Sequence, residues 1–166
     1  MYTLLKTKNE GLKEETLGFL TELLRSPSQE GNESKAAEIV KQEMIKQNYD
    51  KVYQDNAGNI IGIIYGMNAG PTLVLNSHLD TVILDRDSEW KFPPYAGHCE
   101  NGRIYGAGAS DCKGGIAAQV FAGALLKRSL LPLKGNLVVT ATTAEGNGRS
   151  CGVKYLLEET LPSFGL

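Results

Sequence analysis

The sequence has few cysteines and no long apolar run, and both shortages narrow the classes of protein that it can encode. Its 166 residues include three cysteines, Cys99, Cys112 and Cys151, none of them paired as CxxC. Such a sparse, odd set suits a reducing cytoplasm better than a disulfide scaffold, so we expect a cytoplasmic protein. No apolar stretch is long enough to span a bilayer, and the first ten residues lack a secretory signal's apolar segment.

Basic charge is also scarce. Lys and Arg number 17 against 19 Asp and Glu, for a formal net charge of −2, and no basic block occurs. Nucleic acid and anionic membranes are therefore poor candidate partners. The hydrophobic content of 42% is that of an ordinary globular protein, and the length fits one domain over residues 1–166.

The spacing of apolar residues predicts alternating helices and strands. Helical spacing occurs over 10–25, 33–47, 112–128 and 149–160. Short apolar runs bounded by turn residues predict strands over 51–54, 59–65, 72–75, 103–105 and 137–143. We expect residues 83–102 to be irregular.

The order of these segments favours an α/β fold. Asp55–Gly58 is rich in turn residues, which predicts a hairpin between the first two strands. The run 72–75 is apolar on both faces, which is typical of a strand covered on both sides. The strand–helix alternation of the second half indicates a three-layer sandwich around a mixed, mostly parallel sheet.

Two residues that could bind or support a metal follow the strand at 72–75. His78 comes three residues after it and Asp80 two residues later. Imidazole is the commonest metal ligand, and its second ring nitrogen usually donates to a carboxylate or a carbonyl. An H-x-D pair is also common in ordinary surface loops, so this motif alone leaves both interpretations open.

A second loop carries Asp111 at the end of a glycine-rich run, directly before a predicted helix. This carboxylate could bridge two divalent ions, with the glycines letting the backbone pass close to them, or it could simply cap the helix. The run does not match the nucleotide-binding patterns. GxGxxG fails at Asp111, and a P-loop would need Ser or Thr where Gly114 stands.

Three further residues are weaker candidates. Glu145 follows the strand 137–143 and could act as a general base on water, or it could be a solvated turn residue. Cys112 could bind a metal, but a free cysteine is usually a small buried hydrophobe. His98 is interpreted as a surface-loop residue.

In order, these motifs resemble the N-terminal part of the M20 metallopeptidases, which include carboxypeptidase G2-like, succinyl-diaminopimelate desuccinylase-like and acetylornithine deacetylase-like enzymes. The matching pieces are Gly31-x-Glu33, His78-x-Asp80-x-Val82, Gly106-x-Gly108-x-x-Asp111-x-Lys113-Gly114-Gly115 and Thr143-Ala-Glu145-x-x-Gly148. The resemblance implies a zinc-exopeptidase-like catalytic domain with two zinc ions and an inserted lid domain. Cobalt or manganese are alternative metals.

The resemblance also implies roles for individual residues. His78 would bind one metal, Asp111 would bridge both, Asp80 would orient His78, and Glu145 would be the general base. The reaction would be hydrolysis of an amide bond in small peptides or N-acyl amino acids.

The sequence departs from the family pattern in two ways. The family has two adjacent glutamates, a base and a metal ligand, where this chain has Glu145 and Gly146. A one-residue shift of the match would make Glu145 the ligand and leave the base missing, so one carboxylate is absent in either case. The family's remaining ligands and its lid also lie beyond the region that this chain matches. We therefore expect a partial catalytic domain over 1–166, without the lid, that binds metal weakly and is inactive alone.

Two other interpretations remain open. The chain could be a non-catalytic remnant that serves as a binding module, which Gly146 favours, or half of an enzyme completed by another chain. An incomplete sheet would expose an apolar edge, so we also expect a tendency to self-associate.

Overall fold

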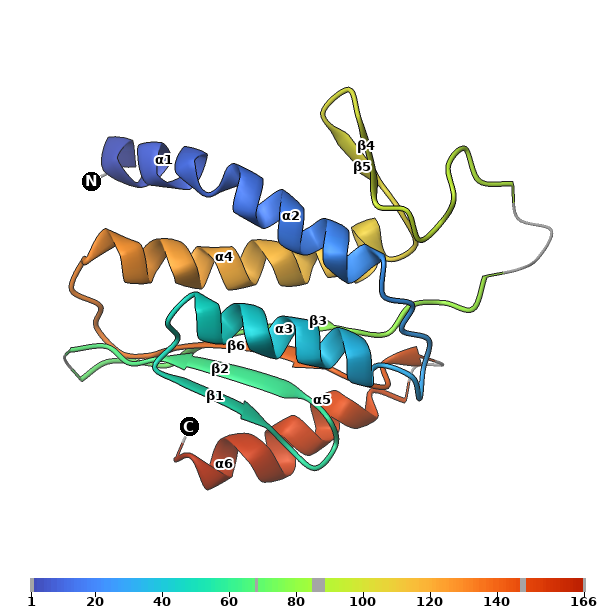
Figure 1. Cartoon of the computed structure of the whole chain (residues 1–166). Helices are drawn as coiled ribbons and strands as arrows, with labels where there is room; N and C mark the ends of the chain where they lie inside the picture. The colour runs from blue at the N-terminus through green and yellow to red at the C-terminus, as the bar shows by residue number, and fades with distance from the viewer. Residues whose placement is uncertain (1, 68, 85–88, 147–148, 166) are drawn as a thin grey trace.

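The computed structural model describes residues 2–67, 69–84, 89–146 and 149–165, and shows an α/β fold (Figure 1). Its helices are α1 (Tyr2–Gly11), α2 (Lys13–Leu24), α3 (Ser34–Lys46), α4 (Gly114–Ser129), α5 (Cys151–Tyr155) and α6 (Leu161–Ser163). Its strands are β1 (Lys51–Gln54), β2 (Ile60–Ile64), β3 (Leu73–His78), β4 (His98–Glu100), β5 (Arg103–Tyr105) and β6 (Leu137–Thr142). None of the described helices is long and apolar enough to cross a membrane.

The main sheet is mixed, with the strand order β1-β2-β6-β3. The predicted hairpin is confirmed, because β1 and β2 pair antiparallel across the turn at 55–58. Strand β2 also pairs antiparallel with β6, whereas β3 pairs parallel with β6. The expectation of a mixed sheet is therefore confirmed, and three of its four strands, β1, β6 and β3, run in the same direction. The tight hairpin reverses β2 relative to β1, and β2 is the strand of this sheet that runs in the opposite direction to the others.

Helices cover both faces of this sheet, which confirms the three-layer architecture (Figure 1). Successive side chains of strand β2 point to opposite faces of the sheet, so each face packs against a different helical layer. Ile60 and Ile64 face the core formed with α2, α3 and α4, whereas Ile61 and Ile63 pack with Leu156 near the C-terminal helices.

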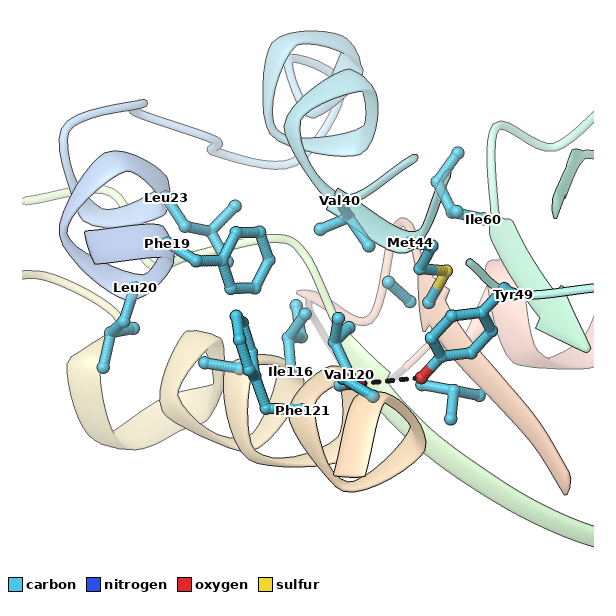
Figure 2. Close-up of a cluster of buried hydrophobic side chains, with 14 of the residues drawn as sticks. Phe19, Leu20, Leu23, Val40, Met44, Tyr49, Ile60, Ile116, Val120 and Phe121 are labelled. Atoms are coloured by element: carbon cyan, nitrogen blue, oxygen red, sulfur yellow. Dashed lines mark hydrogen bonds between the residues drawn. The ribbon is translucent and has the colours of Figure 1, made fainter. Parts of the chain in front are cut away.

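The larger core ties the helices to each other as well as to the sheet. Phe19 of α2 packs on Phe121 of α4, with ring centroids 6.0 Å apart. Tyr49, at the start of the hairpin, donates from its hydroxyl to the Val120 carbonyl at 2.9 Å (Figure 2). A buried polar atom that lacked this acceptor would be destabilising, so the bond fixes where α4 lies over the sheet.

Strand β3 differs from its prediction as a strand covered on both sides. It forms the edge of the sheet, and Leu73 and Val74 are 59% and 38% exposed. Its apolar composition shows that it can be buried, but the described residues do not supply a cover for it. The expected apolar edge is thus present at β3.

The remaining differences concern element boundaries. The helix expected at 10–25 is two helices that meet at the buried Leu12, the first beginning at Tyr2. Residues 83–102, of which 85–88 lie outside the described part, include strand β4, which pairs with β5. The last predicted helix continues from α5 through a π-helical stretch, Leu156–Thr160, into α6.

Candidate metal centre

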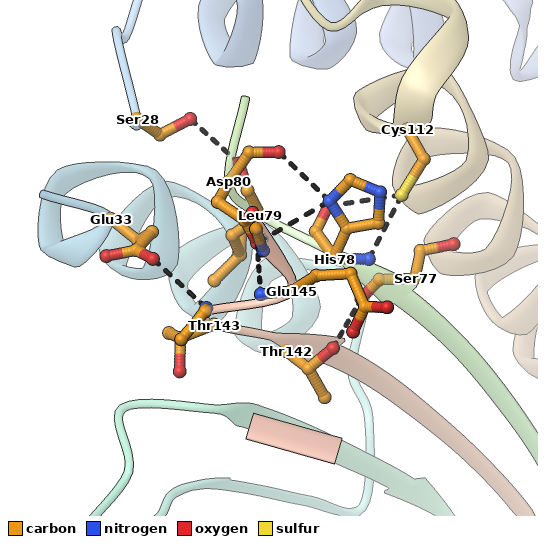
Figure 3. A network of polar contacts seen from close by, with 12 residues as sticks. Ser28, Glu33, Ser77, His78, Leu79, Asp80, Cys112, Thr142, Thr143 and Glu145 are labelled. Atoms are coloured by element: carbon orange, nitrogen blue, oxygen red, sulfur yellow. Dashed lines mark hydrogen bonds and ion pairs between the residues drawn. The ribbon is translucent and has the colours of Figure 1, made fainter. Parts of the chain in front are cut away.

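The parallel pairing of β3 and β6 brings two of the predicted site loops together. His78 is the last residue of β3 and lies opposite Thr142, the last residue of β6. Parallel strands end at the same edge of a sheet, so Asp80 and Glu145, which follow them, are neighbours. Figure 3 shows the side chains of His78, Asp80, Cys112 and Glu145 gathered at this edge.

His78 contacts two of the three predicted carboxylate residues, Asp111 and Asp80. Its Nε2 lies 3.0 Å from Oδ1 of Asp111, which belongs to a loop 33 residues further along the chain. Its Nδ1 lies 2.9 Å from the backbone oxygen of Asp80 and 3.5 Å from the Asp80 carboxylate. The imidazole is therefore held on one side by a carbonyl and turns its other nitrogen toward Asp111, the orientation that a metal ligand requires.

The polar surroundings of His78 raise the pKa of its imidazole to about 10. The hydrogen bond with Cys112 contributes most, Asp111 and Asp80 add to it, and burial acts in the opposite direction. A cation bound at Nε2 would therefore replace a proton held by these same groups.

Asp80 is buried and connects the two loops. Its Oδ1 accepts from the backbone N–H of Glu145 at 3.0 Å, and its Oδ2 accepts from that of Gly146 at 2.9 Å. Both carboxylate oxygens are thus engaged by the loop after β6. The contact of Asp80 with His78 is made chiefly through its backbone oxygen, so this residue positions the loop as much as the imidazole.

Asp111 and Cys112 lie in the turn Ala109–Lys113 that precedes α4. The Asp111 side chain is 85% exposed, so at least one of its oxygens is open to a ligand. The Cys112 sulfur is half-buried against His78, accepting from its backbone N–H at 3.0 Å and donating to its carbonyl at 3.2 Å. His78, Asp111 and Cys112 present potential ligand atoms that all lie within 4.8 Å of one another.

Glu145 does not point its carboxylate into this group. Its Oε1 accepts from the Ser150 hydroxyl at 3.0 Å. A cleft of about 360 Å³ opens beside His78, Asp80 and Asp111, and Gly146 rather than Glu145 is among its described lining residues. Gly148, which completes the sequence motif, lies outside the described residues.

An acidic side chain that sequence reasoning missed occupies the space above Gly146. A Cβ atom at position 146 would lie 2.8 Å from Oε2 of Glu30, which also lines the cleft. Glu30 comes from the loop between α2 and α3, more than 100 residues away in sequence. No local motif marks it, because its place depends on how that loop packs against the strand ends.

The α2–α3 loop also fastens the site. The Ser28 hydroxyl donates to the Leu79 carbonyl at 2.8 Å, and the Ser28 backbone carbonyl accepts from the Thr81 N–H at 2.8 Å. Lys113, fully buried, donates from Nζ to the carbonyls of Leu23 and Ser26 at 3.1 and 2.7 Å. The lysine of the D-x-K-G-G motif therefore binds the turn that contains Asp111 to the end of α2.

His98 lies apart from the described site residues. It is in β4 and stacks on Phe92, with ring centroids 3.8 Å apart. Its interpretation as a residue outside the site agrees with this position, although the segment is a strand and not a loop.

The donor set at the strand ends fits a divalent cation. It combines an imidazole, a carboxylate and a thiol, the ligand types that zinc takes in proteins. Two of the three, His78 and Asp111, are the residues that the sequence analysis assigned to metal.

Comparison with known proteins gives a consistent result. The chain is 32% identical to the uncharacterized protein YgeY of Escherichia coli K12 over 160 residues. The aligned region covers 96% of this chain and 39% of that protein. A solved M20 family metallo-carboxypeptidase, Sso-CP2 of Sulfolobus solfataricus, superposes with a TM-score of 0.67 at 32% identity, covering 76% of this chain and 30% of that one. Human carnosine dipeptidase 1 shares the fold, with a TM-score of 0.82 at 17% identity over 99% of this chain and 38% of that one.

The chain thus spans well under half the length of these relatives. The family model described as peptidase family M20/M25/M40 matches residues 74–165, which include the ends of β3 and β6 and the turn between them that carries Asp111. With its strand order, its metal-type residues and this match, the chain belongs to peptidase family M20/M25/M40.

Proposed function

We propose that this chain is the metal-binding first part of a hydrolase that cleaves amide bonds in small peptides or N-acyl amino acids. The observation that carries the proposal is the 3.0 Å contact of His78 Nε2 with Asp111 Oδ1, two ligand-type atoms from separate loops beside an open cleft. The peptidases among its relatives support the substrate class, but the whole enzyme's activity and substrates are proposals for this chain.

The proposed roles follow from the contacts. His78 and Asp111 would hold the cation, for which zinc is the proposed identity and cobalt or manganese are alternatives. A bound divalent cation supplies Lewis acidity, which activates water and polarises a carbonyl. Asp80 holds the loop of Glu145 and Gly146 against His78 through its two accepted hydrogen bonds.

Glu145 is proposed as the general base, although its carboxylate is turned toward Ser150 in this structure. Its carboxylate accepts from Ser150 and would have to leave that hydroxyl to reach water in the cleft. The role therefore requires the Glu145 side chain to rotate away from Ser150. Substrate or the rest of the catalytic domain would supply the cause of that rotation.

The isolated chain is proposed to lack catalytic activity. Residues 1–166 would form part of a catalytic domain, inactive alone, in a cytoplasmic protein. A non-catalytic binding module is the second candidate, and Gly146 favours it because the position offers no carboxylate to a metal. A half-enzyme completed by a second chain is compatible with the same residue.

Zinc titration by calorimetry tests the proposed site. The wild-type chain should bind zinc, and His78→Ala should remove that binding because the imidazole is the ligand that strand β3 fixes. His98→Ala is the matched control and should bind as the wild type does, since His98 stacks on Phe92 away from the site. Zinc binding that survives His78→Ala unchanged would contradict the assignment.

An activity assay separates the two candidates for the isolated chain. We expect no hydrolysis of dipeptides or N-acetyl amino acids by residues 1–166 with zinc present. Robust turnover that a chelator abolishes would show that the chain is a complete catalyst and would overturn the expectation of inactivity.

A further inference from the structure

The described residues include one group of three metal-type side chains, and one of its members has no assigned role. His78, Asp111 and Cys112 place a ring nitrogen, a carboxylate oxygen and a sulfur within 4.8 Å of one another. The resemblance to the M20 enzymes accounts for the first two. It gives no function to Cys112.

We propose that Cys112 is a third ligand to the metal, so that this chain carries a His/Asp/Cys site for a single zinc ion within its own sequence. The inference rests on the proposed function, because it concerns the same cation. Catalytic zinc is held by three protein ligands with one position left open. His78 and Asp111 alone fall short of that number, and Cys112 completes it.

The backbone places the sulfur where a ligand is needed. Cys112 directly follows Asp111, so the turn that positions the carboxylate also positions the sulfur. That turn is anchored by the buried Lys113, whose Nζ binds two carbonyls at the end of α2. The sulfur reaches the backbone of His78, with contacts of 3.0 and 3.2 Å to its N–H and its carbonyl. Hydrogen bonds therefore hold the end of β3, which carries His78, against the turn that carries Asp111 and Cys112.

Coordination by Cys112 requires only a local exchange of partners. The Cys112 thiol loses its proton to solvent, which ends its hydrogen bond to the His78 carbonyl. The thiolate sulfur then bonds to the metal instead. The N–H of His78 already points at the sulfur and can keep donating to the thiolate. Hydrogen bonds of this type support coordinating side chains in metal sites.

A sulfur ligand predicts which cations the site prefers. Thiolates bind zinc and cobalt well, whereas carboxylate and water ligands suit manganese and magnesium. A site of His78 and Asp111 alone would discriminate less between these ions. With Cys112 bound, the chain should take zinc or cobalt from a mixture that contains excess manganese.

Cobalt titration followed by absorption spectroscopy tests the proposal directly. A thiolate bound to cobalt gives a sulfur-to-metal charge-transfer band in the near ultraviolet, which nitrogen and oxygen ligands do not give. The wild-type chain should develop this band at one cobalt per chain. Cys112→Ser should lose it and bind cobalt at least about tenfold more weakly. Cys99→Ser and Cys151→Ser are the matched controls, because both cysteines are exposed and free, and both variants should keep the band.

Each outcome decides between the claims. Cobalt bound through His78 without the band overturns the role of Cys112 and leaves the proposed function standing. A band that persists in Cys112→Ser also overturns it. Failure of the wild type to bind cobalt at all overturns both.

A second measurement needs no variant and so does not depend on Cys112→Ser folding. Zinc should protect Cys112 from alkylation by iodoacetamide, as located by peptide mass spectrometry, while Cys99 and Cys151 react at unchanged rates. Equal alkylation of Cys112 with and without zinc, under conditions where calorimetry shows binding, would contradict the proposal.

Discussion

Strands β6 and β3 are neighbours in one sheet, yet they differ in how far the described chain buries them. All six residues of β6 are buried, since helices cover both of its faces and a strand pairs on each side. Strand β3 has one strand neighbour, and only Ser77 of its six residues is buried. Sheet interiors need two flanking strands as well as two helical layers, and the described residues provide both for β6 but not for β3.

The candidate site shows the same difference on a smaller scale. His78, Asp111 and Cys112 are brought together by contacts among the described residues. On the other side of the cleft, Gly146 offers no side chain and Glu145 bonds to Ser150. The side of the site built on β3 and the turn before α4 therefore has its potential ligand atoms close together. The side built on the loop after β6 presents no carboxylate of Glu145 or Gly146 to the cleft.

The largest expected effect comes from a matched pair of substitutions in the two strands. Val138 of β6 and Val74 of β3 are register partners, the first fully buried and the second 38% exposed. Val138→Ala should lower the free energy of unfolding by about 2 to 3 kcal/mol, because it leaves a cavity between packed layers. Val74→Ala should lower it by less than about 1 kcal/mol. Urea unfolding monitored by circular dichroism measures both, and equal losses would contradict the difference between the strands.

The next effect concerns the connection between the two loops of the site. Asp80→Asn keeps the size of the side chain but replaces one carboxylate oxygen that accepts a backbone N–H with an amide donor. We expect a loss of about 2 kcal/mol in the free energy of unfolding, because one partly buried N–H loses its acceptor and the other keeps only a neutral one. The same unfolding experiment measures it. A neutral substitution would show that the loop after β6 is held by other contacts.

Self-association is expected to depend on the exposed edge. Leu73 is 59% exposed on β3, and a charge there should hinder pairing of this edge with a second copy. Sedimentation velocity over a dilution series should show a wild-type chain that associates as its concentration rises and a Leu73→Lys variant that stays monomeric. The exposed Leu130, at the C-terminal end of α4, provides the control Leu130→Lys, which should associate like the wild type. A wild-type chain that remains monomeric throughout would count against the proposed tendency.

The smallest effect is a pH dependence on the covered side of the sheet. Glu15 of α2 accepts two hydrogen bonds from Arg128 of α4, both 2.8 Å long, and this pairing lowers the pKa of Glu15 from 4.5 to about 2. A lowered pKa of an acid means that its stabilisation is present above pH 4.5 and is lost as the pH falls toward 2. Both side chains are partly exposed, so the pair contributes at most about 1 kcal/mol.

The variant Glu15→Gln checks this sign. It should be slightly less stable than the wild type at neutral pH, and the difference should shrink as the pH is lowered from 4.5 toward 2. Thermal unfolding at a series of pH values measures the difference. A gap that widens on acidification would mean that another interaction of Glu15 dominates.

Much of the fold and part of the site could be predicted from sequence because they depend on local patterns. Short apolar runs bounded by turn residues located β2 and β6, and turn residues at 55–58 located the hairpin. The proximity of His78 and Asp111 followed from the family motifs, and the structure places their side chains in contact. Local patterns do not encode which strand lies at an edge, so β3 was predicted as covered.

Other features of the site depend on contacts between distant segments. Glu30 lies over Gly146 only because the α2–α3 loop packs beside the loop after β6. The orientation of Glu145 depends on Ser150, and the burial of Lys113 depends on carbonyls of α2. None of these partners lies in the motif of the residue that it contacts, so a sequence taken alone gives no sign of them.

The most direct test of the account is a crystal structure of the chain grown with zinc, with anomalous diffraction recorded at the zinc edge. The account predicts a peak bonded to Nε2 of His78 and an oxygen of Asp111 at about 2.0 to 2.2 Å, on the side of the turn where the Cys112 sulfur lies. Zinc bound elsewhere on the chain, with His78 and Asp111 still in contact with each other and free of metal, would contradict it.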